Sequence, residues 1–340
     1  MCPVIPLHRL GRFKWIMSKL ALKTKLINMI LFVVSLLFAM LISEIFLRIY
    51  LKDDYSVPSH RDWLFRKNWD EKFANLNSLG HRDHEFSVHK SHGIFRILAI
   101  GDSFTYGDGI KRLDDIYTEI LEKKLNKGYH KPKFEVLNIA QKGWGAKDYL
   151  LTLRKVGLSY EPDLVMIGFY LNDIEASPVN RPRPLKIIPK SIHWIFSRVS
   201  YVYWYLYSRI HTWMRKKDIL DYYLSYTSSD SFDWKRFVSF WKQILATCSN
   251  NNIRTVVVIF PHPYWLNDDD PFITVYQNVE NLSKDNGGLV LNLFPFLKGS
   301  NPPELWVGIT DSHPNEKAHQ IYADRIYEFL KKENIVPEFH

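Results

Sequence analysis

The chain has 340 residues, 46% hydrophobic and 24% charged, which is enough for one sizeable folded core with additional segments and excludes a disordered protein. Its net charge of +9 is concentrated in residues 1–25, which contain six basic residues and no acid. No comparable basic stripe remains in the rest of the chain, so we expect no nucleic-acid binding.

A single transmembrane helix is predicted directly after this basic tail. The apolar run begins at Leu26 and ends at Leu47, and at about 1.5 Å per residue it would extend roughly 33 Å, enough to cross a bilayer. A buried core helix and a cleaved signal peptide are the alternatives, but the run is long for a signal peptide and no small-residue cleavage site follows it. Because basic residues precede the run, we expect a cytoplasmic N-terminus, an anchor in a bacterial inner membrane and a periplasmic or otherwise extracytoplasmic domain.

This topology separates the two cysteines of the chain. Cys2 would lie on the cytoplasmic side and Cys248 on the other, so they cannot pair within one chain and a disulfide fold is excluded. No apolar signal precedes Cys2, which excludes a lipoprotein cysteine. Cys248 is expected to be a small buried apolar residue.

Segment 48–92 is expected to be an exposed lead-in to the folded domain. Four of its histidines, at positions 81, 84, 89 and 92, could ligate a metal. Their irregular spacing among Arg82, Lys90 and acidic residues favours an exposed segment instead. We therefore expect neither a metal nor a cofactor.

Residues 93–335 are predicted to form one α/β domain, because short β-branched runs alternate there with stretches at helical spacing. Strands are expected at 95–100, 134–140, 163–169, 255–260 and 289–294, each apolar on both faces as buried parallel strands must be. Helices are expected at 115–126, 146–158, 232–249, 273–285 and 315–332. Right-handed crossovers would produce a three-layer α/β/α sandwich with a five-stranded parallel sheet.

Segment 181–231 interrupts this alternation between the third and fourth predicted strands. It is rich in Trp and Tyr among basic residues. Three interpretations stay open: a helical hairpin packed on the core, a cap over a functional site, or a surface in contact with the bilayer. The last is considered because Trp and Tyr together with Lys and Arg suit a membrane interface.

Two distant segments predict nucleophilic catalysis. The first strand runs into Gly101, Asp102 and Ser103, which places Ser103 at the carboxyl edge of the sheet, where open α/β sheets bind ligands. Asp311 and His313 precede the last helix. A serine hydroxyl needs an imidazole to take its proton and an acid to orient that imidazole, so we predict a Ser103, His313 and Asp311 triad.

Two further loops offer hydrogen-bond donors for a developing oxyanion. Gly143 and Gly145 follow the second strand, where either could present its backbone N–H, and Asn172 follows the third strand with its side-chain amide. Taken singly, a glycine turn and an Asn-Asp pair are ordinary loop chemistry. Their order along the chain predicts an acyl-transfer site.

These four segments resemble the blocks of the SGNH (GDSL-like) hydrolase family, named after a Ser, a Gly, an Asn and a His. The resemblance covers residues 77–330, and NSLGHRDHEF followed by GIFRILAIGDSFTYGDGI is similar to membrane-anchored bacterial members. It implies a flavodoxin-like sheet, metal-free ester hydrolysis, and an oxyanion hole made by the N–H groups of Ser103 and Gly143 and the amide of Asn172.

The sequence departs from the family pattern at three places. One residue separates Asp311 from His313, where the family often has two. Either Gly143 or Gly145 could be the glycine of the second block. We prefer Gly143 because its distance from the following helix is the more usual one. Gly168 lies one residue further from Asn172 than is common, so only Asn172 is carried over.

The resemblance and the expected location together indicate a serine esterase that acts on acetyl or short acyl esters of cell-envelope polysaccharide or lipid. If a sugar hydroxyl replaced water, the same residues would make an O-acyltransferase, and the sequence does not decide between the two. An inactive envelope-assembly or glycan-binding protein with the same fold is a third interpretation.

Overall fold

The structure is a computed structural model that divides into two compact units, one with Met1–Asp53 and Lys190–Tyr207 and the other with Asp54–Pro189 and Ser208–His340. It describes residues 7–51, 70, 72–130, 133–175, 188–267, 269–308 and 311–338. Cys2, residues 52–69 and 71 of the predicted lead-in, and the beginning of the predicted insertion at 181–231 lie outside the described residues.

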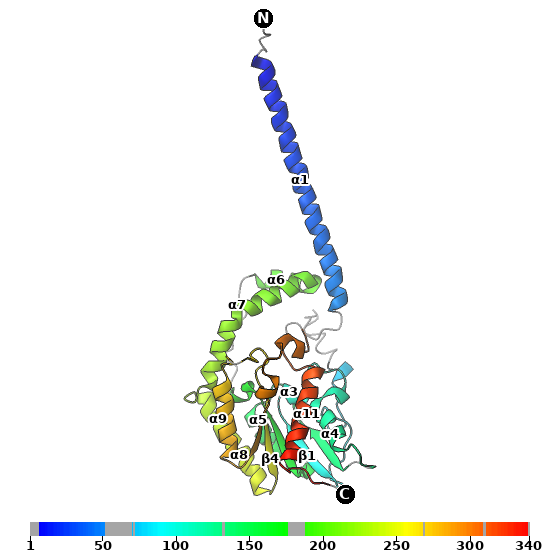
Figure 1. Cartoon of the computed structure of the whole chain (residues 1–340), viewed down its shortest axis with the longest axis vertical. Coiled ribbons are helices and arrows are strands. Elements are labelled where there is room, and N and C mark those ends of the chain that lie inside the picture. Colours follow the sequence, from blue (N-terminus) through cyan, green and yellow to red (C-terminus); the bar gives the residue numbers. More distant parts are fainter. Residues whose placement is uncertain are drawn as a thin grey trace. The chain divides into compact units, whose positions relative to one another are not determined.

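The second unit is built on a five-stranded parallel sheet (Figure 1). The strands are β1 (Phe95–Ile100), β2 (Phe134–Asn138), β3 (Leu164–Phe169), β4 (Arg254–Ile259) and β5 (Leu289–Asn292). They lie in the order β2-β1-β3-β4-β5, and all four neighbouring pairs are parallel. The predicted fold class is therefore confirmed.

Helices cover both faces of this sheet, as its apolar strands require. Helices α5 (Ala146–Lys155), α8 (Phe232–Asn250) and α9 (Ile273–Lys284) pack on one face. Helices α4 (Tyr117–Leu125) and α11 (Glu316–Lys332) pack on the other. The shorter elements are α3 (Ser103–Tyr106), α10 (Phe294–Leu297) and the 3₁₀ turns η1 (Leu113–Asp115), η2 (Gly157–Tyr160), η3 (Leu171–Ile174) and η5 (Pro302–Leu305).

The strand order has a switch point at β1. From β1 the chain crosses to β2 on one side, and it then returns to β3 on the other side. The crossovers therefore diverge at β1, and open α/β sheets bind their ligands at such a switch point. Ser103 follows β1 directly.

Residues 72–92 of the lead-in form part of the second unit. Arg82 and Asp83 are 1% and 6% exposed, and His81 Nε2 lies 2.8 Å from the hydroxyl of Tyr160. The Asp83 carboxylate accepts a hydrogen bond from the backbone N–H of Asn138 at the end of β2. The expectation of an exposed segment is therefore wrong for these residues, because the folded domain supplies hydrogen-bond partners that let them be buried.

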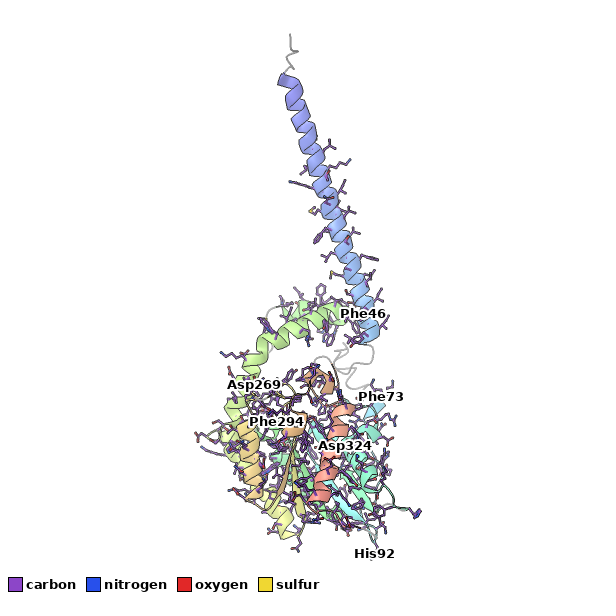
Figure 2. The ribbon with its side chains drawn as sticks, viewed as in Figure 1. Phe46, Phe73, His92, Asp269, Phe294 and Asp324 are labelled. Atoms are coloured by element: carbon purple, nitrogen blue, oxygen red, sulfur yellow. The ribbon has the colours of Figure 1, made fainter. Side chains whose placement is uncertain are left out.

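The first unit contains α1 (Leu7–Tyr50), a helix of 44 residues. Within it, Leu22–Tyr50 is the one helical segment among the described residues that is long and apolar enough to cross a membrane, with a mean hydropathy of 2.7. Its side chains project on all sides and are not buried (Figure 2). The predicted span from Leu26 to Leu47 falls inside it.

Two helices make up the described part of the insertion. Helix α6 (Lys190–Val199) is followed after Ser200 by α7 (Tyr201–Thr227). His193 of α6 lies 3.0 Å from the hydroxyl of Tyr203 of α7, so the two helices are in contact. Helix α6 and the first part of α7 belong to the same unit as α1.

Trp241 of α8 provides a test of the packing on the sheet. Its side chain is fully buried, and its indole N–H donates to Ser283 Oγ at 2.9 Å. We expect Trp241→Ala to lower the free energy of unfolding by about 3–5 kcal/mol, because it leaves a large cavity. Phe232→Ala in the same helix, where the side chain is 72% exposed, should change it by less than about 0.5 kcal/mol in the same denaturant titration. Equal effects of the two substitutions would contradict this packing.

Candidate active site

Ser103 is the first residue of the short helix α3 and is almost completely buried. Asp102 caps this helix by accepting a hydrogen bond from the N–H of Phe104 at 2.9 Å. The helix lies very close to the strands, since a Cβ atom at Gly101 or Gly168 would fall 2.1 or 2.2 Å from Thr105 Oγ1. Glycine at both positions thus lets α3 lie against the carboxyl edge of the sheet, which fixes the position of Ser103.

His313 contacts Ser103 across a sequence separation of 210 residues. Its Nε2 lies 2.9 Å from Ser103 Oγ, and its Nδ1 lies 2.5 Å from Asp311 Oδ1. The Asp311 carboxylate also accepts a hydrogen bond from the backbone N–H of His313 at 3.0 Å, which closes a tight turn. A single intervening residue is therefore enough for Asp311 to reach the ring, and the structure brings the three predicted residues together.

The loop that carries His313 is held by backbone contacts on both sides. The N–H of Val307 donates to the carbonyl of His313 at 2.9 Å, and Trp306 and Pro314 form an isolated antiparallel bridge. Asn315 caps α11 by accepting from the N–H of Ala318. These bonds leave the imidazole of His313 little freedom to move away from Ser103.

Three carboxylates act on the charge of His313. Burial lowers its pKa, but the hydrogen bond and charge of Asp311 and the charges of Asp108 and Asp102 outweigh burial and raise the pKa to about 9. The surroundings therefore stabilise the imidazolium form. This stabilisation would help His313 to take up a proton during a reaction. Because only the neutral imidazole can accept a proton, any activity of His313 as a base would increase with pH.

Asn172 belongs to η3, in the loop that follows β3. Its Oδ1 is buried without a hydrogen-bond partner among the described residues, while its side chain hydrogen-bonds to Asp102. The same turn is held by Asp173, which accepts from the hydroxyl of Tyr149 at 2.6 Å and the N–H of Tyr170 at 3.0 Å. Burial raises the pKa of Asp173 well above its usual value. Sequence reasoning treated Asp173 as ordinary loop chemistry, and only its neighbour Asn172 was selected.

The two candidate glycines after β2 differ in their hydrogen bonding. Gly145 begins α5, and its N–H donates to Asp148 Oδ2 at 3.2 Å. Gly143 has a φ of +73°, a left-handed conformation that favours glycine, and open space lies where its Cβ would be. The commitment of the Gly145 N–H to Asp148 favours Gly143 as the oxyanion donor.

A pocket of about 240 Å³ lies beside these loops. It is lined by Gly143, Trp144, Gly145, Ala146, Lys147, Asp148, Asn172, Asp173, Ile174, Glu175, Arg236, Phe237 and Phe240. The lining combines aromatic rings with both signs of charge. Such a lining suits a polar organic ligand with an apolar face.

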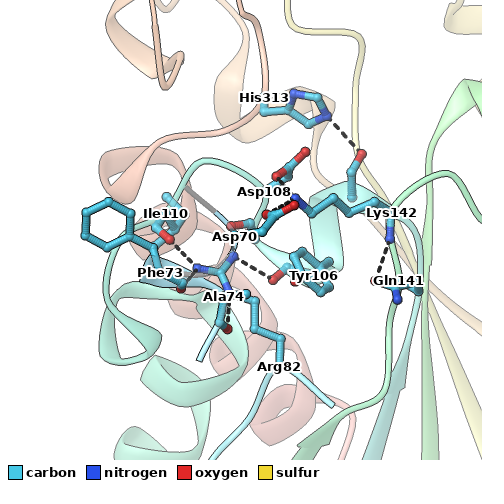
Figure 3. A network of polar contacts seen from close by, with 12 residues as sticks. Asp70, Phe73, Ala74, Arg82, Tyr106, Asp108, Ile110, Gln141, Lys142 and His313 are labelled. Atoms are coloured by element: carbon cyan, nitrogen blue, oxygen red, sulfur yellow. Dashed lines mark hydrogen bonds and ion pairs between the residues drawn. The ribbon is translucent and has the colours of Figure 1, made fainter. Parts of the chain in front are cut away.

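Arg82 supports the loop that follows Ser103 (Figure 3). Its buried guanidinium donates hydrogen bonds to five backbone carbonyls, those of Phe73, Ala74, Tyr106, Gly107 and Ile110. Sequence analysis did not assign Arg82 a role. The signal that could have identified it was its place in NSLGHRDHEF, the segment that resembles the family.

A second charged group missed by sequence reasoning lies beside His313 in Figure 3. Lys142 bridges the carboxylates of Asp108, at 2.8 Å, and Asp70, at 2.6 Å. Burial lowers the pKa of Lys142, but the two carboxylates outweigh it and raise the pKa, so Lys142 stays charged. No sequence signal could have identified this group, because its three members come from separate loops.

One group of described residues has the side chains of a metal site. His84, Asp114 and Glu119 present ligand atoms within 4.8 Å of one another. Asp114, however, already pairs with Lys123 and lies 3.5 Å from Arg112. These cations balance its charge, so we assign no metal to this group.

The chain is similar in sequence to a known protein family. A sequence model of the GDSL-like Lipase/Acylhydrolase family matches residues 99–321. No curated protein matches the chain.

Similar solved structures include a two-domain esterase active on acetylated mannans, which is 14% identical with a TM-score of 0.46 over 73% of this chain and 52% of that one. An acetylxylan esterase from Geobacillus stearothermophilus is 17% identical, with a TM-score of 0.45 over 70% of this chain and 93% of that one. The psychrotrophic esterase EstA from Pseudoalteromonas sp. is 17% identical, with a TM-score of 0.44 over 71% of this chain and 99% of that one. The chain spans about half the length of the two-domain esterase.

The Arg82 cradle can be tested by substitution. We expect Arg82→Met to lower the free energy of unfolding by roughly 3 kcal/mol and to speed amide exchange at residues 106–110, because buried carbonyls lose their donor. Arg112→Met, at a side chain 71% exposed, is the control and should change neither quantity. Unchanged exchange at 106–110 in Arg82→Met, measured by hydrogen–deuterium exchange mass spectrometry, would show that Arg82 does not hold this loop.

Proposed function

Because the chain belongs to the GDSL-like lipase/acylhydrolase family, the SGNH hydrolases, and is therefore a serine hydrolase, we propose that it cleaves acetyl or other short acyl esters with Ser103 as nucleophile. One observation carries the assignment of residues. His313 Nε2 lies 2.9 Å from Ser103 Oγ while Asp311 holds the opposite ring nitrogen. This is the arrangement that serine activation needs.

The reaction proceeds in two steps. His313 takes the proton of Ser103 as Oγ attacks the ester carbonyl, and then gives that proton to the leaving alcohol, which produces an acyl-serine. In the second step His313 takes a proton from water, whose oxygen attacks the acyl carbon. The proton returns to Ser103 as the acid leaves. Asp311 keeps Nδ1 protonated and stabilises the imidazolium in both steps.

The oxyanion of each tetrahedral intermediate is bound by the N–H groups of Ser103 and Gly143 and by the amide of Asn172. Two observations support this assignment: the Gly145 N–H is committed to Asp148, and Asn172 is held by the turn around Asp173. Donors fixed before the reaction need no reorganisation as charge develops, which is the main source of rate acceleration in such sites.

The ester is carried by a cell-envelope polysaccharide or lipid. The pocket beside Gly143 and Asn172 supports a sugar, since its lining combines the aromatic residues Trp144 and Phe240 with the charged residues Arg236 and Glu175. The location follows from α1, which we propose as an inner-membrane anchor with residues 1–25 in the cytoplasm and the α/β unit outside.

Hydrolysis and acyl transfer share the first step and differ only in the acceptor. A sugar hydroxyl that took the place of water would make the enzyme an O-acyltransferase through the same acyl-serine. Product analysis with and without an added oligosaccharide separates the two, because transfer would move the acyl group onto the sugar instead of releasing the free acid.

Replacement of the nucleophile tests the central assignment. We expect Ser103→Ala to lower kcat on p-nitrophenyl acetate by roughly three to six orders of magnitude and to abolish labelling by a fluorophosphonate, and Asn172→Ala to lower kcat by about two to three orders. Ser239→Ala, at an exposed serine of α8, is the control. A Ser103→Ala protein that kept most of its activity would exclude Ser103 as nucleophile. If wild-type Ser103 were not labelled at all, the fold would serve a non-catalytic role.

The pH profile tests the role of Asp311. Only neutral His313 can act as base, so kcat/KM should rise with pH towards the raised pKa of this residue, which is about 9. Asp311→Asn removes the largest contribution that raises this pKa, while burial continues to lower it, so the acid limb should move to lower pH as kcat falls. An acid limb that stayed in place in Asp311→Asn would contradict the pairing.

A further inference from the structure

Helix α6 has an exposed apolar face. Ile192, Ile195, Phe196 and Val199 recur at the spacing of one side of a helix and are 44%, 49%, 48% and 57% exposed. The helix contains basic residues but no acidic ones. A face of this kind in water costs free energy and favours aggregation, so something apolar is expected to cover it.

Helix α6 is tied to α1 by a set of polar contacts around Glu44. The carboxylate of Glu44 accepts hydrogen bonds from Ser200 Oγ at 2.9 Å and from the N–H groups of Tyr201 at 3.0 Å and Val202 at 3.1 Å. It therefore caps the beginning of α7 and satisfies N–H groups that the helix itself cannot. All of these residues belong to one compact unit.

Arg48, one turn further along α1, completes this set of contacts. It forms an ion pair with Glu44 at 2.8 Å, and its guanidinium donates to the carbonyl of Val199 at 2.6 Å, the last residue of α6. The guanidinium also lies over the ring of Tyr201. Glu44 and Arg48, the two charged residues near the end of the candidate span, thus both bind the junction between α6 and α7. These contacts fix the junction at the depth of Glu44.

We propose that α6 is an interfacial helix that lies in the outer surface of the same bilayer that α1 crosses, with Ile192, Ile195, Phe196 and Val199 in the acyl boundary. The proposal rests on the proposed membrane anchor. Phospholipid covers the apolar face of α6, because this face is joined through Glu44 and Arg48 to the apolar span of α1, close to the end of that span.

The charges and rings of α6 suit the headgroup region. The guanidinium of Arg198 stacks over the ring of Trp194, 3.6 Å from its centroid. Trp and Arg side chains combine an apolar body with a polar tip, so they favour the boundary between acyl chains and water. A helix with basic residues and no acid is also attracted to anionic lipids. Helix α6 is therefore a second membrane contact of this chain.

Site-directed spin labelling of the full chain in nanodiscs of phosphatidylethanolamine and phosphatidylglycerol tests the proposal. In a Cys2→Ser, Cys248→Ala background, single labels are placed at Ile195→Cys and at Trp194→Cys. At about 100° per residue, Trp194 points away from the apolar face. Accessibility to oxygen relative to a water-soluble nickel chelate reports depth. We expect this ratio to be several-fold higher at 195 than at 194.

A third label, Leu36→Cys in the middle of α1, separates this proposal from the anchor on which it depends. High oxygen accessibility at 36 with equal, aqueous accessibility at 194 and 195 would show that the chain is anchored and that α6 is not in the bilayer. A label at 195 shielded from both reagents would show a protein partner on this face, which overturns the proposal. Aqueous accessibility at 36 would overturn the anchor and the interfacial helix together.

The contacts of Glu44 provide a second variant. Glu44→Ala removes the acceptor for three hydrogen bonds, so we expect the oxygen-to-nickel ratio at 195 to fall several-fold while the ratio at 36 stays unchanged. Glu44→Gln keeps one acceptor oxygen and should retain most of the ratio at 195. If Glu44→Ala left the ratio at 195 unchanged, Glu44 would not fix the depth of α6.

Discussion

The hydrogen bond between His313 and Ser103 is the interaction on which the proposed chemistry depends, and it is held in place by a buried relay between α11 and α3. His319 of α11 accepts the N–H of Tyr117 through Nδ1 at 3.2 Å, and the hydroxyl of Tyr117 donates to Thr105 of α3 at 3.2 Å. Burial lowers the pKa of His319 to about 3, so its ring stays neutral and remains an acceptor at ordinary pH. The relay therefore fixes the helix after His313 against the helix that begins at Ser103.

Much of the fold could be predicted because its strands are apolar on both faces and its helices keep a regular period. Predicted boundaries differed by a few residues where regular pairing gives way to a loop. Strand β2, for example, ends at Asn138 rather than at residue 140, although the N–H of Ile139 still donates to the carbonyl of Ala99. Ser103 was predicted from its place at a strand end and His313 from its place before the last helix, whereas the selection of Gly143 and Asn172 depended on the family resemblance.

The contacts that could not be predicted join polar groups that are distant in sequence. Arg82 and Asp83 lie in a polar segment, and the folded domain supplies the N–H of Asn138 and three of the five carbonyls that make their burial possible. Glu44 lies near the end of the predicted transmembrane run. Its hydrogen-bond partners begin at Ser200, 156 residues away, and no local pattern indicates them.

Groups that are distant in sequence also determine the charge of the proposed base, His313. The carboxylates of Asp311, Asp108 and Asp102 all favour the imidazolium form of His313. The charges of Asp108 and Asp102 are themselves partly compensated. Lys142 pairs with Asp108, while burial raises the pKa of Asp102 to about 6 and so weakens its charge near neutral pH. Asp311 alone touches the ring. The site therefore combines one acid that contacts and orients the base with two acids that raise its pKa through their charge alone and are themselves partly compensated, Asp108 by Lys142 and Asp102 by burial. This compensation favours activity, because a protonated base cannot accept the proton of Ser103.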